Sequence, residues 1–489
     1  MPVCAERKEN NWGILPGCAL IAFVYVLLCS MCSPLYPLNI WDDANCLLTV
    51  GRVMKAGGVL YRDIYEQKGP LLYFIHMLAA MVSDSSFFGV FLFEVVSLTA
   101  VLMSAWKLMR LWTGKYSAWA GTLLFGACVL VSRSFARGDS AEEFCLPFLM
   151  AALYMVCAYA KRKDEPLPAK KMLLLGILAG CVAAIKYTVL SLFVGLCLAQ
   201  GSFQLAQRDV RGVCKSAGAF LLGMLLPVLP WVLHFAAHGA LQDAYTAYIH
   251  NNIFLYHAAP RKLGGVVKEI ARAGIQNVSW SLLAFCGVLL VCLSKGEKAF
   301  LRVSVALGAL AAGAVVFLPG TVYPYYPLVL CVFAPFALAF LLARAERILK
   351  DGLIFVPLAV CISMIAVTLF SPNAFLRGVK LEDTAQGKLA ARMEPGASLL
   401  QYSHLDDGLY LTHGVLPEEK YFVLLNVAYE NMRESLDEAV REGRADYVLV
   451  SWRELPQEFS GYTLIAQEMG YDDENRLNKP LYLYRKEEQ

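Results

Sequence analysis

Residues 41–74, "WDDANCLLTVGRVMKAGGVLYRDIYEQKGPLLYF", concentrate charged side chains in an otherwise apolar part of the chain. Asp42 and Asp43 are adjacent, and a second charged cluster follows the two glycines and consists of Arg62, Asp63, Glu66 and Lys68. A carboxylate can take the proton of a hydroxyl acceptor, and a lysine or arginine can hold a phosphate and stabilise charge on a leaving oxygen. The apolar segment "LLYFIHMLAAMV" after "KGP" would offer a surface for a lipid. These residues therefore indicate chemistry on a phosphate-linked lipid.

A simpler interpretation is that the aspartates cap a helix over residues 42–58, which begins with acids and ends with glycines. Such a helix would lie along the membrane surface, with its apolar residues Leu47, Leu48, Val50 and Met54 in lipid. Capping explains one aspartate. It leaves the second aspartate and the charged cluster unexplained.

The composition places this stretch in a membrane protein. Of 489 residues, 58% are hydrophobic and 17% are charged, whereas about a quarter of the residues of a soluble protein are charged. Apolar runs recur to about residue 370, and runs of roughly 18 or more such residues are typical of membrane-spanning helices. The net charge of +3 gives no reason to expect nucleic acid. Most of the 15 cysteines lie in apolar runs, and their spacing does not indicate zinc.

We predict eleven spanning helices, at approximately 13–36, 86–110, 117–134, 143–161, 171–185, 188–206, 216–237, 277–294, 300–318, 326–344 and 352–371. This arrangement puts the short basic loops on one side, which the positive-inside rule makes cytoplasmic. These loops are "AERKEN", "KLMRLWTGK", "KRKDEPLPAKK", "QRDVRGVCK", "SKGEKAFLR" and "ARAERILKDG". The basic segment 261–272 is an exception on the opposite side. Either it lines a surface near anionic lipid head groups, or the helix at 277–294 is misplaced.

Four polar segments share the opposite, outer side: 41–74, 133–144, 248–262 and 319–327. The chain after residue 371 holds about half of all the acids, which predicts a separate domain at 372–489 after a transmembrane domain at 1–371. Strands at "SLLQYS", "YFVLL", "DYVLVSW" and "LYLYRK" and a helix at "YENMRESLDEAVREG" predict a small α/β fold. We interpret this tail as a packing or lid domain on the outer side; contact of "HLDD", 404–407, with a ligand is the alternative.

The opening stretch resembles the first outer loop of C-type glycosyltransferases, membrane enzymes that use polyprenyl-phosphate sugars. The resemblance is to the bacterial branch related to protein O-mannosyltransferases and lipid A aminoarabinose transferases. It rests on Asp43, on Gly51 with Arg52, on "GVLYRD" at 58–63 and on "KGPLLY" at 68–73. It implies an all-α polytopic membrane domain with juxtamembrane helices in the first outer loop, followed by a small α/β domain.

By this resemblance Asp43 is the catalytic base. Many relatives have Asp-Glu there, and Ala44 departs from that pattern, so Asp42 stays an alternative. Candidates for the donor phosphate or lipid are Lys68, Arg62, Arg137 and Lys186. Candidates for the acceptor or sugar are Asp63, Glu66, Glu142, Glu143, His250, Asn251 and Tyr325.

Several of these candidates have a simpler interpretation. Glu142 and Glu143 fit the first turn of a helix opened by Ser140. Lys186 fits a lysine that reaches to the membrane surface, and Tyr325 fits an interfacial aromatic belt. The sequence demands no cofactor and predicts no defined metal site, although an acidic pair could hold Mg²⁺ or Mn²⁺ through carboxylate oxygens.

The hypothesis is an inverting glycosyltransferase of the bacterial cell membrane. It would pass a sugar from a polyprenyl-phosphate donor to a hydroxyl of a glycolipid, glycopolymer or protein, with its active site and tail outside the cytoplasm. The alternative is a transporter or flippase of lipid-linked sugars. Transporters place charges near the bilayer midplane, whereas here the acids gather on one outer face, which favours the enzyme.

Overall fold

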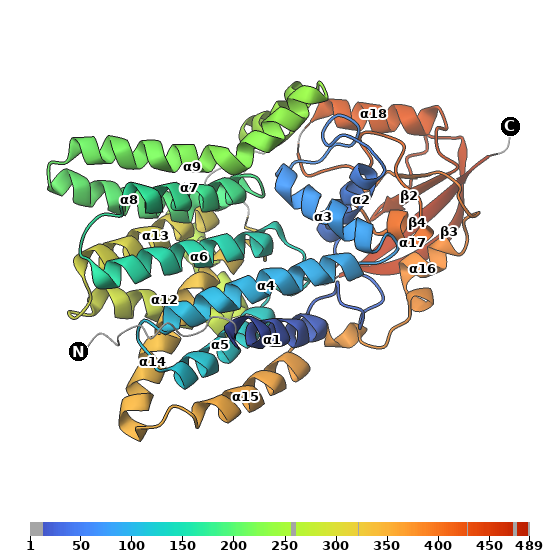
Figure 1. Ribbon diagram of the computed structural model, residues 1–489. Helices are drawn as coiled ribbons and strands as arrows, with labels where there is room; N and C mark the ends of the chain where they lie inside the picture. The colour runs from blue at the N-terminus through green and yellow to red at the C-terminus, as the bar shows by residue number, and fades with distance from the viewer. Residues whose placement is uncertain (1–12, 256–260, 321, 428, 473–476, 488–489) are drawn as a thin grey trace.

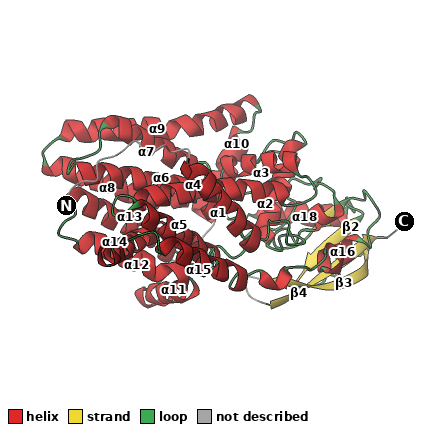
Figure 2. Ribbon diagram, turned by 60° about the horizontal axis from the view of Figure 1, so that its bottom comes forward, coloured by secondary structure: helices red, strands yellow, loops and turns green. Residues whose placement is uncertain are grey.

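The computed structural model describes residues 13–255, 261–320, 322–427, 429–472 and 477–487. A bundle of helices forms one part of the molecule and a small sheet with its own helices forms the other (Figure 1). Figure 2 shows the same division, with strands confined to the C-terminal end. The basic segment "AERKEN" lies outside the described residues.

Each of the eleven segments predicted as spans is helical. They are α1 (Ile14–Cys29), α4 (Phe88–Met109), α5 (Lys115–Leu130), α6 (Ala141–Arg162), α7 (Ala169–Ala183), α8 (Ser191–Ala206), α9 (Val210–Ala237), α12 (Val278–Leu293), α13 (Ala299–Phe317), α14 (Ala334–Leu349) and α15 (Phe355–Leu369). Single 3₁₀ segments, η2 (Tyr187–Leu190) and η4 (Tyr326–Phe333), lead into α8 and α14.

Six described segments are both long and apolar enough to cross a membrane, namely Phe88–Met109, Ala141–Arg162, Tyr187–Ala206, Val210–Ala237, Ala299–Phe317 and Tyr326–Leu349. A bent pair, α11 (Leu263–Gln276) with α12, passes the same test when taken together. The other predicted spans are helices of 15 or 16 residues, about 24 Å long at 1.5 Å per residue. The short helices pack beside the long ones, so the predicted polytopic α-helical domain is confirmed as the fold.

Small residues let two of these helices approach closely. A Cβ atom built on Gly176 of α7 would lie 2.1 Å from the carbonyl oxygen of Phe220 on α9. A Cβ atom on Gly223 of α9 would lie 2.1 Å from the carbonyl oxygen of Leu173 on α7. Glycines at a helix interface are a common means of close packing in membranes, where no hydrophobic effect drives helices together.

The connections α8–α9 and α14–α15 lie at the end of the bundle away from the sheet (Figure 1). The outer segments of the sequence analysis lie at the other end, against the C-terminal part: Tyr65 donates its N–H to the carbonyl of Lys420, and Asn426 donates to the hydroxyl of Tyr323 at 3.2 Å. The basic connections α8–α9 and α14–α15 are therefore separated along the bundle from the outer segments that contain Tyr65 and Tyr323, as predicted. Which end faces the cytoplasm stays a prediction.

The first outer loop forms two helices, α2 (Asp42–Lys55) and α3 (Pro70–Val82), as the resemblance implied. The N-cap of α2 is Trp41, without a side-chain capping bond, so capping by an aspartate was wrong. The expected lipid contact of α2 was also wrong, because Leu47, Leu48 and Val50 are at most 1% exposed inside the protein. The helix is buried because it packs on α3 on one side and on the tail on the other. The polar first turn of α2 is therefore covered by protein and not by lipid.

Beyond α15, the chain forms a four-stranded sheet in the order β1-β2-β4-β3. The strands are β1 (Leu399–Gln401), β2 (Tyr447–Ser451), β3 (Tyr462–Asp472) and β4 (Leu477–Lys486); β1 and β2 are parallel, and the other pairs are antiparallel. The helices α16 (Ala385–Ala390), α17 (Leu409–His413) and α18 (Glu430–Arg441) accompany the sheet. The small α/β fold is therefore confirmed, with α18 where the sequence predicted a helix.

Two strand assignments in this part differ from the prediction. The segment 421–425 does not form a strand. Its residue Leu424 forms an isolated β-bridge with His404. Its apolar residues are buried without forming a strand, since Phe422 and Val423 are at most 1% exposed in a loop that packs against the domain. The strand β3 was missed, because its exposed residues Leu464, Ile465 and Met469 hide the alternation that marks a strand.

Candidate active site

Asp43 lies at the centre of a buried charged cluster at the start of α2. Its carboxylate accepts a hydrogen bond from Lys68 Nζ at 2.8 Å and another from the hydroxyl of Tyr325 at 3.3 Å. Lys68 also pairs with Glu66 at 3.2 Å. Glu66 is fully buried, and its second oxygen accepts the backbone N–H groups of Gln67 and Lys68. The turn at 66–68 is therefore fixed by Glu66 and directs the lysine at Asp43.

The two partners set each other's protonation. Burial by itself raises the pKa of Asp43, but the charge and hydrogen bond of Lys68 outweigh it, so that the pKa lies below its usual value of 3.8. For Lys68, burial lowers the pKa, and the charges of Asp43 and Glu66 raise it well above 10.5. Asp43 is thus an ionised carboxylate and Lys68 an ammonium group at neutral pH.

A second, half-buried lysine lies next to this cluster. Lys186, between α7 and η2, pairs with Glu142 of α6 at 2.6 Å. Its Nζ atom also lies 4.2 Å from the ring centre of Tyr326 and 5.4 Å from that of Tyr325. Tyr325 therefore links the two lysines. Its hydroxyl contacts Asp43, the partner of Lys68, and its ring lies beside Lys186. Lys186 does not merely reach to the membrane surface, and Tyr325 is not part of a lipid-facing belt, since it is 8% exposed.

Aromatic rings and one arginine close the site on the side of the α1–α2 loop. The rings of Trp41 and Tyr325 are 5.0 Å apart, and the guanidinium of Arg137 lies 5.2 Å from the ring centre of Trp41. Arg137 is 4% exposed. The structure therefore brings Asp43, Glu66, Lys68, Arg137, Glu142, Lys186 and Tyr325 into one neighbourhood.

The tail contributes a lysine that the sequence analysis missed. Lys479 of β4 is 3% exposed and forms ion pairs with Asp42, at 2.7 Å, and with Asp407. Burial lowers the pKa of Lys479, but these two carboxylates raise it well above its usual value. No local motif marks this residue, because Asp42 and Lys479 are separated by 437 residues. The two aspartates of α2 thus have different partners, Asp42 in the tail and Asp43 in the membrane domain.

The segment 404–415 of the tail follows one face of α2. Asp406 accepts a hydrogen bond from the Thr49 hydroxyl at 2.7 Å, and Arg52 donates to the carbonyl groups of Tyr410 and Val415. Asp42, Thr49 and Arg52 lie on the same side of the helix, where side chains three or four residues apart are neighbours. "HLDD" therefore contacts α2, so Asp406 and Asp407 have protein partners.

A second polar cluster lies behind α2. His76 of α3 faces Asp139 at 2.7 Å, while Glu94 of α4 accepts hydrogen bonds from the Ser30 hydroxyl and the Asp139 N–H. Asp139 has a backbone φ of 60°, an uncommon conformation for a residue with a side chain. Glu143 is buried beside this cluster, and Ser140 caps α6 as expected. His76, Glu94 and Asp139 were not found from the sequence; "RGD" before a capped helix was the available signal.

Besides Asp42 and Glu143, four predicted site residues lie outside the cluster at Asp43. Arg62 and Asp63 pair with each other at 2.7 Å near the surface, and Arg62 also donates to the carbonyl of His238. His250 and Asn251 belong to the π-helical segment η3 (Tyr245–Leu255), where Asn251 donates to the Tyr65 hydroxyl at 2.7 Å. These contacts hold in place the outer loop on which the site is built.

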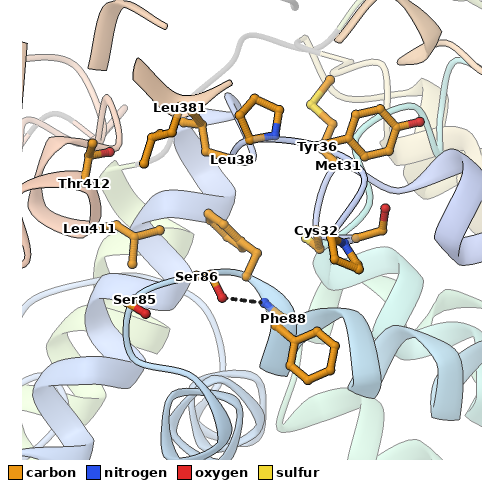
Figure 3. Close-up of a pocket in the computed structure, with 14 residues that line it drawn as sticks. Met31, Cys32, Tyr36, Leu38, Ser85, Ser86, Phe88, Leu381, Leu411 and Thr412 are labelled. Atoms are coloured by element: carbon orange, nitrogen blue, oxygen red, sulfur yellow. Dashed lines mark hydrogen bonds between the residues drawn. The ribbon is translucent and has the colours of Figure 1, made fainter. Parts of the chain in front are cut away.

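No group of three or more His, Cys, Asp or Glu side chains in the described ranges is arranged to hold a metal ion. Use of Mg²⁺ or Mn²⁺ stays an untested prediction. A pocket of about 230 Å³ lies between the loop that precedes α2, the α3–α4 connection and the tail (Figure 3). Its lining includes Tyr36, Ser86, Phe88, Leu381 and Thr412, so it is separate from the cluster at Asp43.

Solved structures share this arrangement of helices and tail. The chain is similar to ArnT from Cupriavidus metallidurans in the apo state, with a TM-score of 0.63, and to the same protein bound to undecaprenyl phosphate, with a TM-score of 0.62. In both cases the identity is 12%, and the match covers 97% of this chain and 98% of the other. It is also similar to the oligosaccharyltransferase from Archaeoglobus fulgidus in complex with zinc and sulfate, with a TM-score of 0.50, 14% identity, and coverage of 95% and 72%.

At such low identity these similarities establish the fold. They confirm the predicted fold, a polytopic helical domain followed by a small α/β domain, while membership of the C-type glycosyltransferases and the branch stay predictions. Residues 6–349 match a protein family described as "Putative competence-induced protein Ccs4 N-terminal domain", and the chain belongs to this family. No curated protein matches the sequence.

Proposed function

We propose that the protein is an inverting glycosyltransferase that moves a sugar from a polyprenyl-phosphate carrier to a hydroxyl acceptor. The observation that carries this proposal is the pairing of Asp43 with Lys68 beside a second half-buried cation, Lys186, at one end of the bundle. A carboxylate with two cations offers a base for an acceptor and a clamp for a phosphate leaving group. The fold is shared with ArnT, which has been crystallised with undecaprenyl phosphate.

In this proposal, Lys68 and Lys186 bind the donor phosphate, and Arg137 adds positive charge near the same site. As the bond between the sugar and the phosphate breaks, the lysines stabilise the negative charge that develops on the leaving oxygen. Asp43 takes the proton of the acceptor hydroxyl, whose oxygen attacks the anomeric carbon from the opposite side. Tyr325, whose hydroxyl contacts Asp43, orients the carboxylate and lines the acceptor side together with Glu142.

The ion pair between Asp43 and Lys68 also links donor binding to base strength. Without a donor, Lys68 lowers the pKa of Asp43 and makes it a weak base. A phosphodiester monoanion that binds Lys68 engages its charge and hydrogen bonds and so weakens this pull on Asp43. Burial, which acts in the opposite direction, then raises the pKa of Asp43 and makes the carboxylate a better base. In this proposal the carboxylate is the stronger base when the donor is in place.

The acceptor is proposed to be a glycolipid, a glycopolymer or a protein outside the cytoplasm. We place the active site and the tail on the outer face of a bacterial cell membrane, because the basic loops gather at the other end of the bundle.

The test is transfer from defined polyprenyl-phosphate sugars to extracted envelope acceptors by the purified full-length protein. Asp43→Asn should lower turnover by about 10²- to 10⁴-fold, the range for loss of a positioned base, with little change in donor binding. Lys68→Ala should weaken donor binding and turnover together. Asp42→Asn is the matched control, because it makes the same change one residue away and affects the pair with Lys479.

The proposal is wrong if Asp43→Asn retains full turnover in a working assay. If Asp42→Asn abolishes turnover and Asp43→Asn does not, the base is the neighbouring residue. Movement of a lipid-linked sugar across vesicles without any transfer to an acceptor would establish a flippase instead.

A further inference from the structure

The helix α11 (Leu263–Gln276) has no role in the proposed chemistry and contains most of the basic segment that departed from the predicted charge pattern. It meets α12 at an angle of 117°. Figure 2 shows α11 at the lower edge of the bundle next to α12. A helix that turns this sharply away from the span beside it does not continue that span, and we take α11 to run along the membrane surface. The helix at 277–294 is therefore correctly placed, and the exception lies in α11.

The position of α11 along the membrane normal follows from its first contacts. Arg261, which precedes the helix, donates its N–H to the carbonyl of Leu318 and its Nε–H to that of Pro319. The segment after Pro319 leads to Tyr325, which contacts Asp43. The start of α11 is thus at the same end of the bundle as the candidate active site, where the spans reach the polar surface.

The helix α11 has a buried apolar side, an exposed apolar side and a polar side. Val266 and Ala273 are buried against the protein. Leu263, Val267 and Ile270 are 80%, 59% and 48% exposed, and their spacing of four and three residues puts them on one side of the helix. On α12, the apolar residues Val278, Leu282, Phe285 and Leu289 are also exposed, as expected for a side that faces lipid. The exposed apolar side of α11 therefore extends a lipid-facing surface.

The polar residues of this segment are mostly cations. Between residues 261 and 272 four cations, namely Arg261, Lys262, Lys268 and Arg272, stand against one acid, Glu269, which leaves a net charge of +3. Glu269 pairs with Arg261 at 3.1 Å and with Arg272 at 3.5 Å. In the described part of the chain, Lys262 and Lys268 have neither an ion pair nor a side-chain hydrogen bond. Exposed cations beside exposed aliphatic side chains match the two parts of an anionic lipid.

We propose that α11 is a binding site for anionic phospholipid head groups. Leu263, Val267 and Ile270 lie among the acyl chains, and Lys262, Lys268 and Arg272 contact the phosphate and neighbouring anionic groups. Amphipathic helices of this type bind membranes by apolar burial together with attraction to anionic lipids. Each cation near an anionic surface strengthens binding about five-fold, so three cations together account for roughly 10²-fold.

The experiment measures binding of fluorescent phosphatidylglycerol and phosphatidylcholine to the full-length protein in detergent micelles. The wild type should prefer phosphatidylglycerol, and the preference should fall with added salt. The triple variant K262Q/K268Q/R272Q should lose about 10- to 100-fold of its affinity for phosphatidylglycerol and keep that for phosphatidylcholine. The control variant K163Q/K380Q/K388Q removes three other exposed cations, and it should retain the preference.

Thermal unfolding of the triple variant should match that of the wild type, because the substituted side chains are exposed. If its unfolding temperature falls, the charge-reduced variant K262Q/K268Q, which leaves the Glu269 pairs intact, replaces it in the comparison. The proposal is overturned if the triple variant binds phosphatidylglycerol as the wild type does, or if the wild type does not distinguish the two lipids. It is also overturned if inorganic phosphate at millimolar concentration displaces the lipid, since the site would then take free phosphate.

This assay requires no catalysis. Asp43→Asn should bind phosphatidylglycerol as the wild type does, so failure of the lipid site and failure of the proposed transferase activity are distinguishable.

Discussion

The substitution Lys479→Met tests whether the tail is held on the candidate active site by buried charge. The lysine is 3% exposed, and the side chain of its partner Asp407 is 1% exposed. Removal of the ammonium group leaves the Asp407 carboxylate buried without its cation, which typically costs about 3–5 kcal/mol. Asp42 adds less to this cost, because 26% of its side chain is exposed and water can solvate it.

The assay is native-state proteolysis of the full-length protein, with the cleavage rate in the tail as the readout. When opening is fast, this rate follows the equilibrium population of the opened tail. A loss of about 3–5 kcal/mol should therefore speed cleavage by roughly 10²- to 5 × 10³-fold. Lys380→Met is the control, because its pair with Glu382 is exposed, at 74% and 72%, and such surface pairs contribute about 0–1 kcal/mol.

The double variant K479M/D407N separates the charge interaction from packing. With both charges removed, no buried carboxylate is left unpaired at 407, so the variant should open more slowly than Lys479→Met alone. The coupling between the two substitutions should reach about 1–3 kcal/mol, as for residues in one ion-pair network. Equal cleavage rates for Lys479→Met and Lys380→Met would refute the reasoning, and so would additive effects in the double variant.

Three further predictions follow from the structure. In Lys68→Met the pKa of Asp43 should rise, because burial is then opposed only by Lys186 and the Tyr325 hydroxyl; the acid limb of the kcat/KM profile should move to higher pH, and an unshifted limb would show that Lys68 does not control the base. Gly223→Val should destabilise the packing of α7 and α9 by about 1–3 kcal/mol, measured as a lower unfolding temperature, and an unchanged temperature would show that the two helices separate readily. A cysteine at Arg62, in a cysteine-free background, should react with an impermeant thiol reagent in intact cells, and one at Lys163 should not; the opposite result would reverse the topology.

The sequence alone determined the helices and the division into a polytopic membrane domain and an α/β tail. Each of the eleven apolar segments is a helix, because a chain in a bilayer must satisfy its backbone hydrogen bonds within the segment. The pattern around "GVLYRD" and "KGPLLY" predicted the two short helices of the outer loop and the C-type fold. Asp43, Glu66 and Lys68 lie within 26 residues of one another, so their proximity in space could be anticipated from a local motif.

The tertiary structure decided which other side chains meet this motif. Tyr325 and Lys186 come from segments far along the chain and contact Asp43 and its neighbours. From the sequence, each could equally have been a residue of the membrane surface. Arg62 and Asp63 belong to the same local motif, yet they pair with each other near the surface because the backbone turns away after Gly58. Lys479 shows the limit most clearly. Its partner Asp42 is 437 residues away, and an ion pair between distant segments leaves no periodicity or spacing in the sequence, because only the packing of β4 on α2 brings the two charges together.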